Sequence, residues 1–145
     1  MSTYISSDII KTPKVYATEL YDNNIPVVGY TYSTSGNFKC YEYRDGRLVI
    51  EYCKKLTSEV EINLIDGNTY YANIGSGSFP IAFTDMPMVF AGIGRSDNNA
   101  PMCTLSFDAV DNYGFARAIV WTMRSSTMKL SSGYTINGLF VGRWK

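Results

Sequence analysis

The sequence predicts an all-β protein that folds as an antiparallel β-sandwich. From Asn37 onward, short apolar or alternating runs are separated by turn signals every 8–12 residues or so, the spacing typical of sandwiches and barrels. The chain contains 12 tyrosines, 7 phenylalanines and 2 tryptophans, residues that favour strands. No window shows the sustained apolar period of about 3.6 residues that a helix needs. A chain of 145 residues can bury the core of one such domain.

Two parts of the chain are expected, a leader over residues 1–36 and a sandwich domain over residues 37–145. The leader lacks the apolar residues of a domain, and holds a strand-like piece at 15–21 and a polar link that ends at Gly36. Turn residues between the apolar runs delimit the strands of the sandwich. Strands are expected at residues 38–44, 47–54, 59–65, 69–74, 78–83, 87–94, 102–109, 113–122 and 134–144.

The first hairpin of the sandwich has an expected register. Asp45-Gly46 is a strong signal for a two-residue turn, which would place Arg44 opposite Arg47. The facing pairs are then Tyr43 with Leu48, Tyr41 with Ile50 and Lys39 with Tyr52 on an apolar side, and Glu42 with Val49 and Cys40 with Glu51 on a mixed side. In this register Cys40 and Cys53 are diagonal neighbours, so we expect both thiols to be reduced.

Two prolines mark the middle of the chain. Pro80 fits an edge or first position of a strand because it cannot donate to a sheet ladder, and Pro87 repeats this pattern after a polar turn. Phe79, Ile81 and Phe83 would alternate onto one face of the 78–83 strand, which we expect to be the core face. The following strand should end in the longest exposed loop, and Trp144 should be packed.

Composition excludes several classes of function. The 13 basic and 13 acidic residues give a net charge of zero without a basic run, so a nucleic-acid partner is not expected. The chain has no histidine, and its three cysteines, Cys40, Cys53 and Cys103, lack paired zinc-ligand spacing. No cofactor or metal is therefore expected. There is no apolar run of about 20 residues and no signal-peptide layout, so we expect a soluble protein made in a cytoplasm, without membrane insertion.

Several stretches, in order, resemble a known family. They are residues 78–89 (SFPIAFTDMPMV) and 138–145 (GLFVGRWK), with residues 14–28 (KVYATELYDNNIPVV) and the tyrosine-rich YEYRDG and EYC at 41–46 and 51–53. Together they resemble the C-terminal tip domains of bacteriophage tail-fibre and minor tail proteins. The chain departs from that pattern at Asn24-Ile25, where a glycine is usual, and in having tyrosines where tryptophans are usual in the hairpin.

This resemblance implies a lectin-like tip domain that follows a short fibre neck. It implies a receptor-binding role in a virion tail, with adhesion to a host cell-surface polysaccharide or glycan and contacts to other tail proteins. It also implies a homotrimer, in which apolar neck residues would meet their copies around a three-fold axis. Those residues are Val15, Leu20, Ile25 and Val27.

Sugar binding needs aromatic faces with polar groups beside them, and two places in the sequence supply both. The candidate ligand-binding residues are Arg95, Asp97, Asn98 and Asn99 in the polar loop, with Tyr113, Trp121 and Arg124 further along. The alternative for Tyr113 and Trp121 is a place in the core of the 113–122 strand. Tyr70 and Tyr71 should split by strand alternation, which leaves one of them exposed.

Two other classes of function stay open. A purely structural tail component would have the same fold, and its loops at 95–99 and 122–127 would be covered by other chains. A polysaccharide-trimming enzyme would need two carboxylates on one cleft, but most acidic residues here lie in turns or on polar faces, so no enzyme is expected. Asp108 and Asp111 could hold a hard cation with Asn112, although they lack the spacing of a calcium loop.

Overall fold

The protein is all-β, and every strand pair in its described residues is antiparallel. The computed structural model describes residues 21–22, 25–26, 29–94, 103–123 and 128–145, and for 21–22 and 25–26 it describes the backbone alone. The strands are β1 (Tyr21–Asp22), β2 (Ile25–Pro26), β3 (Tyr30–Ser35), β4 (Phe38–Tyr43), β5 (Arg47–Lys55), β6 (Val60–Ile62), β7 (Leu64–Asp66), β8 (Thr69–Asn73), β9 (Gly77–Ser78), β10 (Met88–Gly94), β11 (Thr104–Val110), β12 (Gly114–Thr122), β13 (Met128–Leu130) and β14 (Thr135–Arg143).

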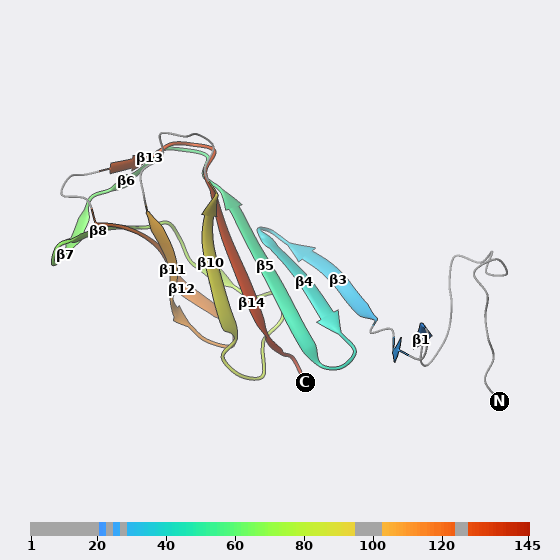
Figure 1. Cartoon of the computed structure of the whole chain (residues 1–145). Helices are drawn as coiled ribbons and strands as arrows, with labels where there is room; N and C mark the ends of the chain where they lie inside the picture. Colours follow the sequence, from blue (N-terminus) through green and yellow to red (C-terminus); the bar gives the residue numbers. More distant parts are fainter. Residues whose placement is uncertain (1–20, 23–24, 27–28, 95–102, 124–127) are drawn as a thin grey trace, which may run out of the picture.

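Two five-stranded sheets form the body of the molecule (Figure 1). The first has the order β10-β14-β5-β4-β3, and we call it the front sheet. The second has the order β11-β12-β8-β7, with β9 paired to β12 beside β8, and we call it the back sheet. Two small ribbons, β13-β6 and β1-β2, lie outside these sheets. Non-consecutive neighbours such as β14 and β5 show that the chain crosses between sheets.

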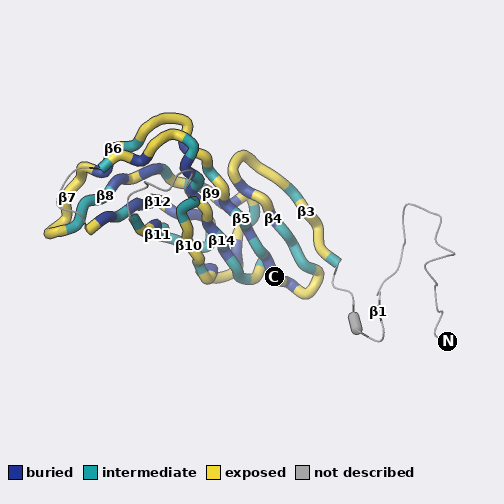
Figure 2. Tube along the Cα trace, turned by 45° about the horizontal axis from the view of Figure 1, so that its top comes forward, coloured by how far each residue is buried: buried dark blue, intermediate teal, exposed yellow. Residues whose placement is uncertain are grey.

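The core is a layer of phenylalanine rings between the two sheets. Phe140 of the front sheet contacts Phe107 and Phe115 of the back sheet, with ring centroids 5.1 and 5.8 Å apart. Tyr52 and Phe38 of the front sheet also meet Phe115. Facing aromatic rings bury large apolar areas and stabilise the face-to-face packing of a sandwich. The predicted antiparallel sandwich is therefore confirmed, and Figure 2 shows its buried residues between the sheets.

Most of the predicted strands are present within a few residues, but the segment at 78–83 is not a strand. Only Ser78 belongs to β9, and residues 79–83 cross from the back sheet to the front sheet. Phe79 N donates to Tyr113 O at 2.7 Å, and Phe83 N donates to Asn112 O at 2.9 Å. Pro80 has no N–H for a ladder, which favours this irregular crossing. Both phenylalanines are nevertheless buried, as expected for core residues.

The register predicted for the first hairpin is wrong by one residue. Cys40 pairs with Ile50 and Tyr41 pairs with Val49, because the loop has three residues and not two. Gly46 has a φ of 91°, and its N–H donates to Tyr43 O at 3.0 Å, the features of a turn followed by a bulge residue. A shift of one residue moves every side chain of a strand to the other face. Cys40 is consequently buried, and Tyr41 and Tyr43 point away from the core.

Residues 30–35, predicted as part of the leader with a polar link at residues 32–36, instead form β3. This strand pairs with β4 along its whole length and makes one edge of the front sheet. Its alternating threonine and serine residues are compatible with an edge strand that has little core to cover. The predicted strand at 59–65 is divided into β6 and β7, and β13 was not predicted. The strand-like piece at 15–20, and the neck residues Val15, Leu20 and Val27, lie outside the described residues.

The segment after β14 closes over the β4–β5 turn. Trp144 N donates to Gly46 O at 3.0 Å, and the indole N–H of Trp144 donates to Tyr43 O at 3.1 Å. Arg143 adds a hydrogen bond from its guanidinium group to Asp45 O at 3.1 Å. Trp144 is half-buried and packs against the core, so the prediction that it is packed is confirmed. Figure 1 shows this end of the chain beside the turn.

Candidate ligand-binding surfaces

Four tyrosines form a continuous patch on the outer face of the front sheet. Tyr30 and Tyr32 come from β3, Tyr41 and Tyr43 come from β4, and we call them the tyrosine array. The pairing places Tyr32 opposite Tyr41 and Tyr30 opposite Tyr43. Tyr30 is 56% exposed and Tyr32 is 50% exposed, while the two tyrosines of β4 are half-buried. The array is thus an open aromatic surface on the edge of the sheet.

Strand geometry produces the array from two short sequence patterns. Residues two apart on a strand point to the same face, so Tyr-Thr-Tyr at 30–32 and Tyr-Glu-Tyr at 41–43 each present two rings. The ring centroids are 5.2 Å apart for Tyr32 and Tyr41, 5.7 Å for Tyr30 and Tyr41, and 5.5 Å for Tyr30 and Tyr43. Cross-strand aromatic pairs of this kind stabilise a sheet, and here they also hold the rings in place.

Charged groups border the array at the β4–β5 turn. The Arg47 guanidinium group lies over the Tyr43 ring at 4.6 Å from its centroid. Arg47 also pairs with Asp45 at 2.7 Å, and hydrogen bonds from the Arg47 backbone and side chain lower the pKa of the Asp45 carboxyl group. Partial desolvation, assisted by the Glu51 carboxylate, raises the pKa of the Tyr41 hydroxyl. A tyrosine hydroxyl is protonated at neutral pH, so that of Tyr41 can donate a hydrogen bond to a ligand.

An apolar row continues from the array across the whole front sheet. The pairings place Tyr41 opposite Val49, Val49 opposite Val141, and Val141 opposite Met88 on the far edge strand. Met88 is 64% exposed, and its neighbour on the same face, Phe90, is 53% exposed. Apolar side chains exposed in a continuous row mark an interaction surface more often than isolated ones do.

A shallow pocket of about 340 Å³ lies on this same face, beside the apolar row. Phe90 and Leu139 supply apolar walls, and Glu51 and Asn137 supply a carboxylate and an amide. Gly92 contributes open space, since a Cβ atom at this position would have no atom within 4 Å. An aromatic ring next to a carboxylate and an amide is the combination that sugar binding requires.

Trp121, a predicted site residue, lies on the outer face of the back sheet. It is half-buried, its ring centroid is 5.3 Å from that of Tyr71, and its indole N–H donates to Ser106 Oγ at 2.7 Å. Tyr70, by contrast, packs against the core. The two adjacent tyrosines thus differ in their contacts, but neither is exposed as expected, because Tyr71 is half-buried beside Trp121. Trp121 and Tyr71 form a second, smaller aromatic surface, on the opposite side of the molecule from the tyrosine array.

The structure does not bring Tyr113 and Trp121 together. Tyr113 is 64% exposed in the β11–β12 turn, whereas Trp121 lies near the other end of β12. Eight residues of strand separate them, a distance of roughly 26 Å. Neither ring belongs to the core layer, so the alternative of two core residues does not hold. The other predicted residues, Arg95, Asp97, Asn98, Asn99 and Arg124, lie outside the described residues.

The two aspartates considered for a cation make hydrogen bonds within the protein. Asp111 Oδ1 accepts from Tyr113 N at 2.7 Å and from Gly114 N at 2.9 Å, which forms the β11–β12 turn. Asp108 accepts from Ala109 N at 2.8 Å and pairs with Arg117. Within the described residues, no group of three or more histidine, cysteine, aspartate or glutamate residues is arranged to hold a metal ion. These contacts give both aspartates a role in shaping the turn.

The sequence analysis missed the tyrosine array, although a signal for it was present. Tyrosines two residues apart occur at 30 and 32 and again at 41 and 43, and this spacing indicates a shared face. The assumption of a two-residue turn placed the second pair on the apolar side. The assignment of residues 1–36 to a leader, with a polar link at residues 32–36, removed the first pair from the sheet. A three-residue turn with Gly46 as a bulge would have placed Tyr41 and Tyr43 on the outer face, and a strand at residues 30–35 was needed for the other two rings.

Comparisons with known proteins give two solved structures that are similar to this chain. One is an N-truncated R1-type pyocin tail fibre, with 21% identity over 79% of this chain and 86% of the other, and a TM-score of 0.46. The second is the C-terminal part of a P. aeruginosa R1 pyocin fibre, with 21% identity and a TM-score of 0.47, of which this chain spans 28%. No family model and no curated protein matches the chain.

No helix in the described part of the chain is long and apolar enough to span a membrane.

Proposed function

We propose that this protein is a receptor-binding component of a phage-type tail fibre or baseplate, and that it adheres to a glycan on the host cell surface. The tyrosine array is the observation that carries the proposal. It presents four rings on one exposed face, and phenol rings stack on the C–H faces of sugars while their hydroxyl groups reach sugar oxygens. The resemblance of the sequence motifs to tail-fibre tip domains supports the same role.

The proposed activity is binding and not catalysis. Two pockets of the described residues fit this proposal, because one is lined by Glu51 as its single carboxylate and the other by none. Hydrolysis of a glycosidic bond generally uses a pair of carboxylates that flank the bond. In this proposal the protein acts in a virion tail by adhesion, and its partners are a surface polysaccharide and other tail proteins.

The proposal can be tested with a double variant of the array, Tyr32→Ala with Tyr41→Ala. We expect its affinity on an array of bacterial surface polysaccharides to fall by about tenfold or more, which equals about 1.4 kcal/mol or more. Adsorption to host cells should fall in parallel. The control is Ile65→Ala, which removes an exposed side chain of β7, outside the array and outside the predicted ligand-binding residues, and should leave binding unchanged.

Retention of full binding by the double variant would contradict a role for the tyrosine array. Loss of binding in Trp121→Ala, with the array variant unaffected, would place the site on the back sheet. Tyr32→Phe with Tyr41→Phe separates the two contributions, because these changes keep the rings and remove the hydroxyl groups. We expect this variant to retain most of the binding if ring stacking dominates.

We also propose that the protein assembles as a homotrimer. The proposal is supported by the family resemblance and by the exposed apolar side chains of Met86, Met88 and Phe90, which a neighbouring subunit would cover. Light scattering of the purified protein at micromolar concentration should give three times the mass of the chain. A monomer mass under these conditions would contradict the trimer and leave the glycan site to be judged by its own test.

A further inference from the structure

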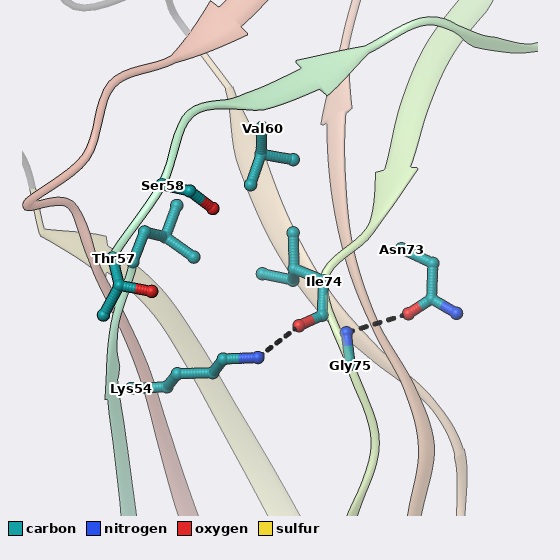
Figure 3. A pocket seen from close by; sticks show the side chains of 8 residues that line it. Lys54, Thr57, Ser58, Val60, Asn73, Ile74 and Gly75 are labelled. Atoms are coloured by element: carbon teal, nitrogen blue, oxygen red, sulfur yellow. Dashed lines mark hydrogen bonds between the residues drawn. The ribbon is translucent and has the colours of Figure 1, made fainter.

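A second pocket, of about 400 Å³, opens at one end of the sandwich, and it is unrelated to the tyrosine array (Figure 3). It lies where the chain leaves β5 and where β8 ends. Lys54 supplies an ammonium group, and Thr57 and Ser58 supply hydroxyl groups, and Figure 3 shows these groups directed toward one space. Leu56, Val60 and Ile74 give the pocket apolar walls.

The ammonium group of Lys54 brings an uncompensated positive charge to this pocket. Lys54 Nζ donates to Ile74 O at 2.7 Å, which uses one of its three N–H donors. No carboxylate occurs among the eight described residues that line the pocket. Glu59, which is close in sequence, is paired with Lys129 at 2.7 Å and does not line the pocket. The two other donors of this half-buried ammonium group therefore have no carboxylate partner among the residues that line the pocket.

The neighbouring polar groups favour a ligand that also bears hydroxyl groups. Asn73 Oδ1 accepts from Gly75 N at 3.1 Å, which leaves the amide NH₂ group of Asn73 to donate elsewhere. The hydroxyl groups of Thr57 and Ser58 can both donate and accept. A pocket of this size lies in the usual range for small organic ligands, and its apolar walls would contact a carbon skeleton.

We propose that this pocket binds a sugar acid, with its carboxylate on Lys54 and its hydroxyl groups on Thr57, Ser58 and Asn73. The inference rests on the proposed function for its choice of a glycan ligand, but it depends on different residues. Lys54 is on the inner side of β5 at the open end of the sandwich, whereas the array is on the outer face of β3 and β4. The pocket would add to the proposed function a preference for acidic glycans over neutral ones.

The test is a titration of the intact protein with sodium glucuronate, followed by NMR of the backbone amides. We expect the amide chemical shifts of Ile74, Gly75 and Ser58 to change at millimolar concentrations of glucuronate. Methyl glucoside, which has the same ring without the charge, should produce at least tenfold weaker binding, and so should inorganic phosphate. Lys54→Met should weaken glucuronate binding at least tenfold. The matched control is Lys55→Met, the exposed neighbour on the other face of β5, which should have no effect.

Several results would overturn the proposal. One is that glucuronate causes no change in the amide chemical shifts at the pocket. Another is that glucuronate binds no more tightly than methyl glucoside or phosphate. A third is that Lys55→Met weakens glucuronate binding as much as Lys54→Met does. Because Lys54→Met also loses the hydrogen bond that ties β5 to Ile74 O, Thr57→Val serves as a second variant, in which the new side chain has a shape similar to that of threonine. It should also weaken glucuronate binding, and unchanged affinity in a folded Thr57→Val would contradict the proposed hydroxyl contacts.

The tyrosine array variant distinguishes this pocket from the proposed adhesion site. Tyr32→Ala with Tyr41→Ala should bind glucuronate as the parent does, and Lys54→Met should still bind neutral glycans through the array. Failure of the array variant to lose glycan binding would contradict the proposed function while leaving the glucuronate result intact.

Discussion

The two faces of the front sheet carry different aromatic residues. Its inner face and the facing back sheet contain phenylalanines, and Phe38, Phe115 and Phe140 are buried there. Its outer face near the β3 edge contains the four tyrosines of the array. Among the seven phenylalanines, Phe90 is the one whose side chain is mainly exposed.

This difference has a simple physical cause. A buried tyrosine must find a hydrogen-bond partner for its hydroxyl group, whereas a phenylalanine needs none. Tyr52 and Tyr134 are buried exceptions, and within the described residues no buried side-chain polar atom lacks a partner. On the outer face, water satisfies the hydroxyl groups until a ligand replaces it. The inner rings therefore determine stability, and the outer rings are available for binding.

The largest effect should come from Phe140→Ala. Phe140 is fully buried and contacts the rings of Phe79, Phe107 and Phe115. We expect its removal to lower the free energy of unfolding by about 3–5 kcal/mol, since it leaves a cavity in the ring layer. Denaturant unfolding measures this loss. Phe90→Ala on the outer face is the control, with an expected loss under about 1 kcal/mol. Similar losses in the two variants would show that the faces do not differ in this way.

A smaller effect of the same kind is expected at two glycines. A Cβ atom at Gly142 would lie 2.7 Å from the buried Phe83 ring, whereas a Cβ atom at Gly92 would have no neighbour within 4 Å. Gly142→Ala should therefore cost about 1–3 kcal/mol through overpacking. Gly92→Ala should change the stability by no more than about 0.5 kcal/mol. Thermal melts of both variants compare the inner and outer faces, and a stable Gly142→Ala would show that the core can yield there.

The smallest effect concerns the thiols of the front sheet. Cys40 is buried on the inner face, and burial raises the pKa of its thiol, while Cys53 is exposed on the outer face. The unfolded chain loses the Cys40 proton near its ordinary pKa of about 8.5, but the folded protein keeps it. Stability should therefore be complete below about pH 8.5 and decline as the pH rises toward the folded pKa. Urea melts at neutral and alkaline pH measure this, with Cys53→Ala as the control that keeps the decline.

Thiol reagents provide a separate check of the same contrast. Cys53 should react in the folded protein, and Cys40 should react only on unfolding. Rapid modification of Cys40 under native conditions would contradict its burial.

The positions of most strands could be predicted from the sequence. The register of the strands and the connections between them could be predicted only in part. Alternation and turn signals located β5, β8, β10, β12 and β14 because these strands have one apolar side. The segment at 79–83 has the same alternation without being a strand, since its phenylalanines reach the core from a crossing. Periodicity reports which side chains are buried, and it does not report whether the backbone pairs with a neighbour.

The candidate site was harder to predict for a related reason. Trp121 was predicted as a site residue because a tryptophan with polar neighbours in the sequence is typical of sugar binding. The tyrosine array depends on the pairing of β3 with β4 and on the three-residue loop at Arg44–Gly46. A single residue in that loop decides whether Tyr41 and Tyr43 face the core or the solvent. The Lys54 pocket is lined by residues from the end of β5 and from the end of β8, which belong to different sheets. No local pattern in the sequence indicates that these two strand ends lie close together.

The crossing at residues 79–84 also bears on how the chain folds. Its backbone bonds to Tyr113, Asn112 and Arg143 can form only after distant segments have met, and the central pairing of β5 with β14 has the same requirement. Closing such long loops loses chain entropy before the contacts stabilise the product, so all-β chains of this topology refold in milliseconds to seconds. Until then, the strand edges and the phenylalanines are accessible to other chains, and the yield of refolded protein should fall as its concentration rises.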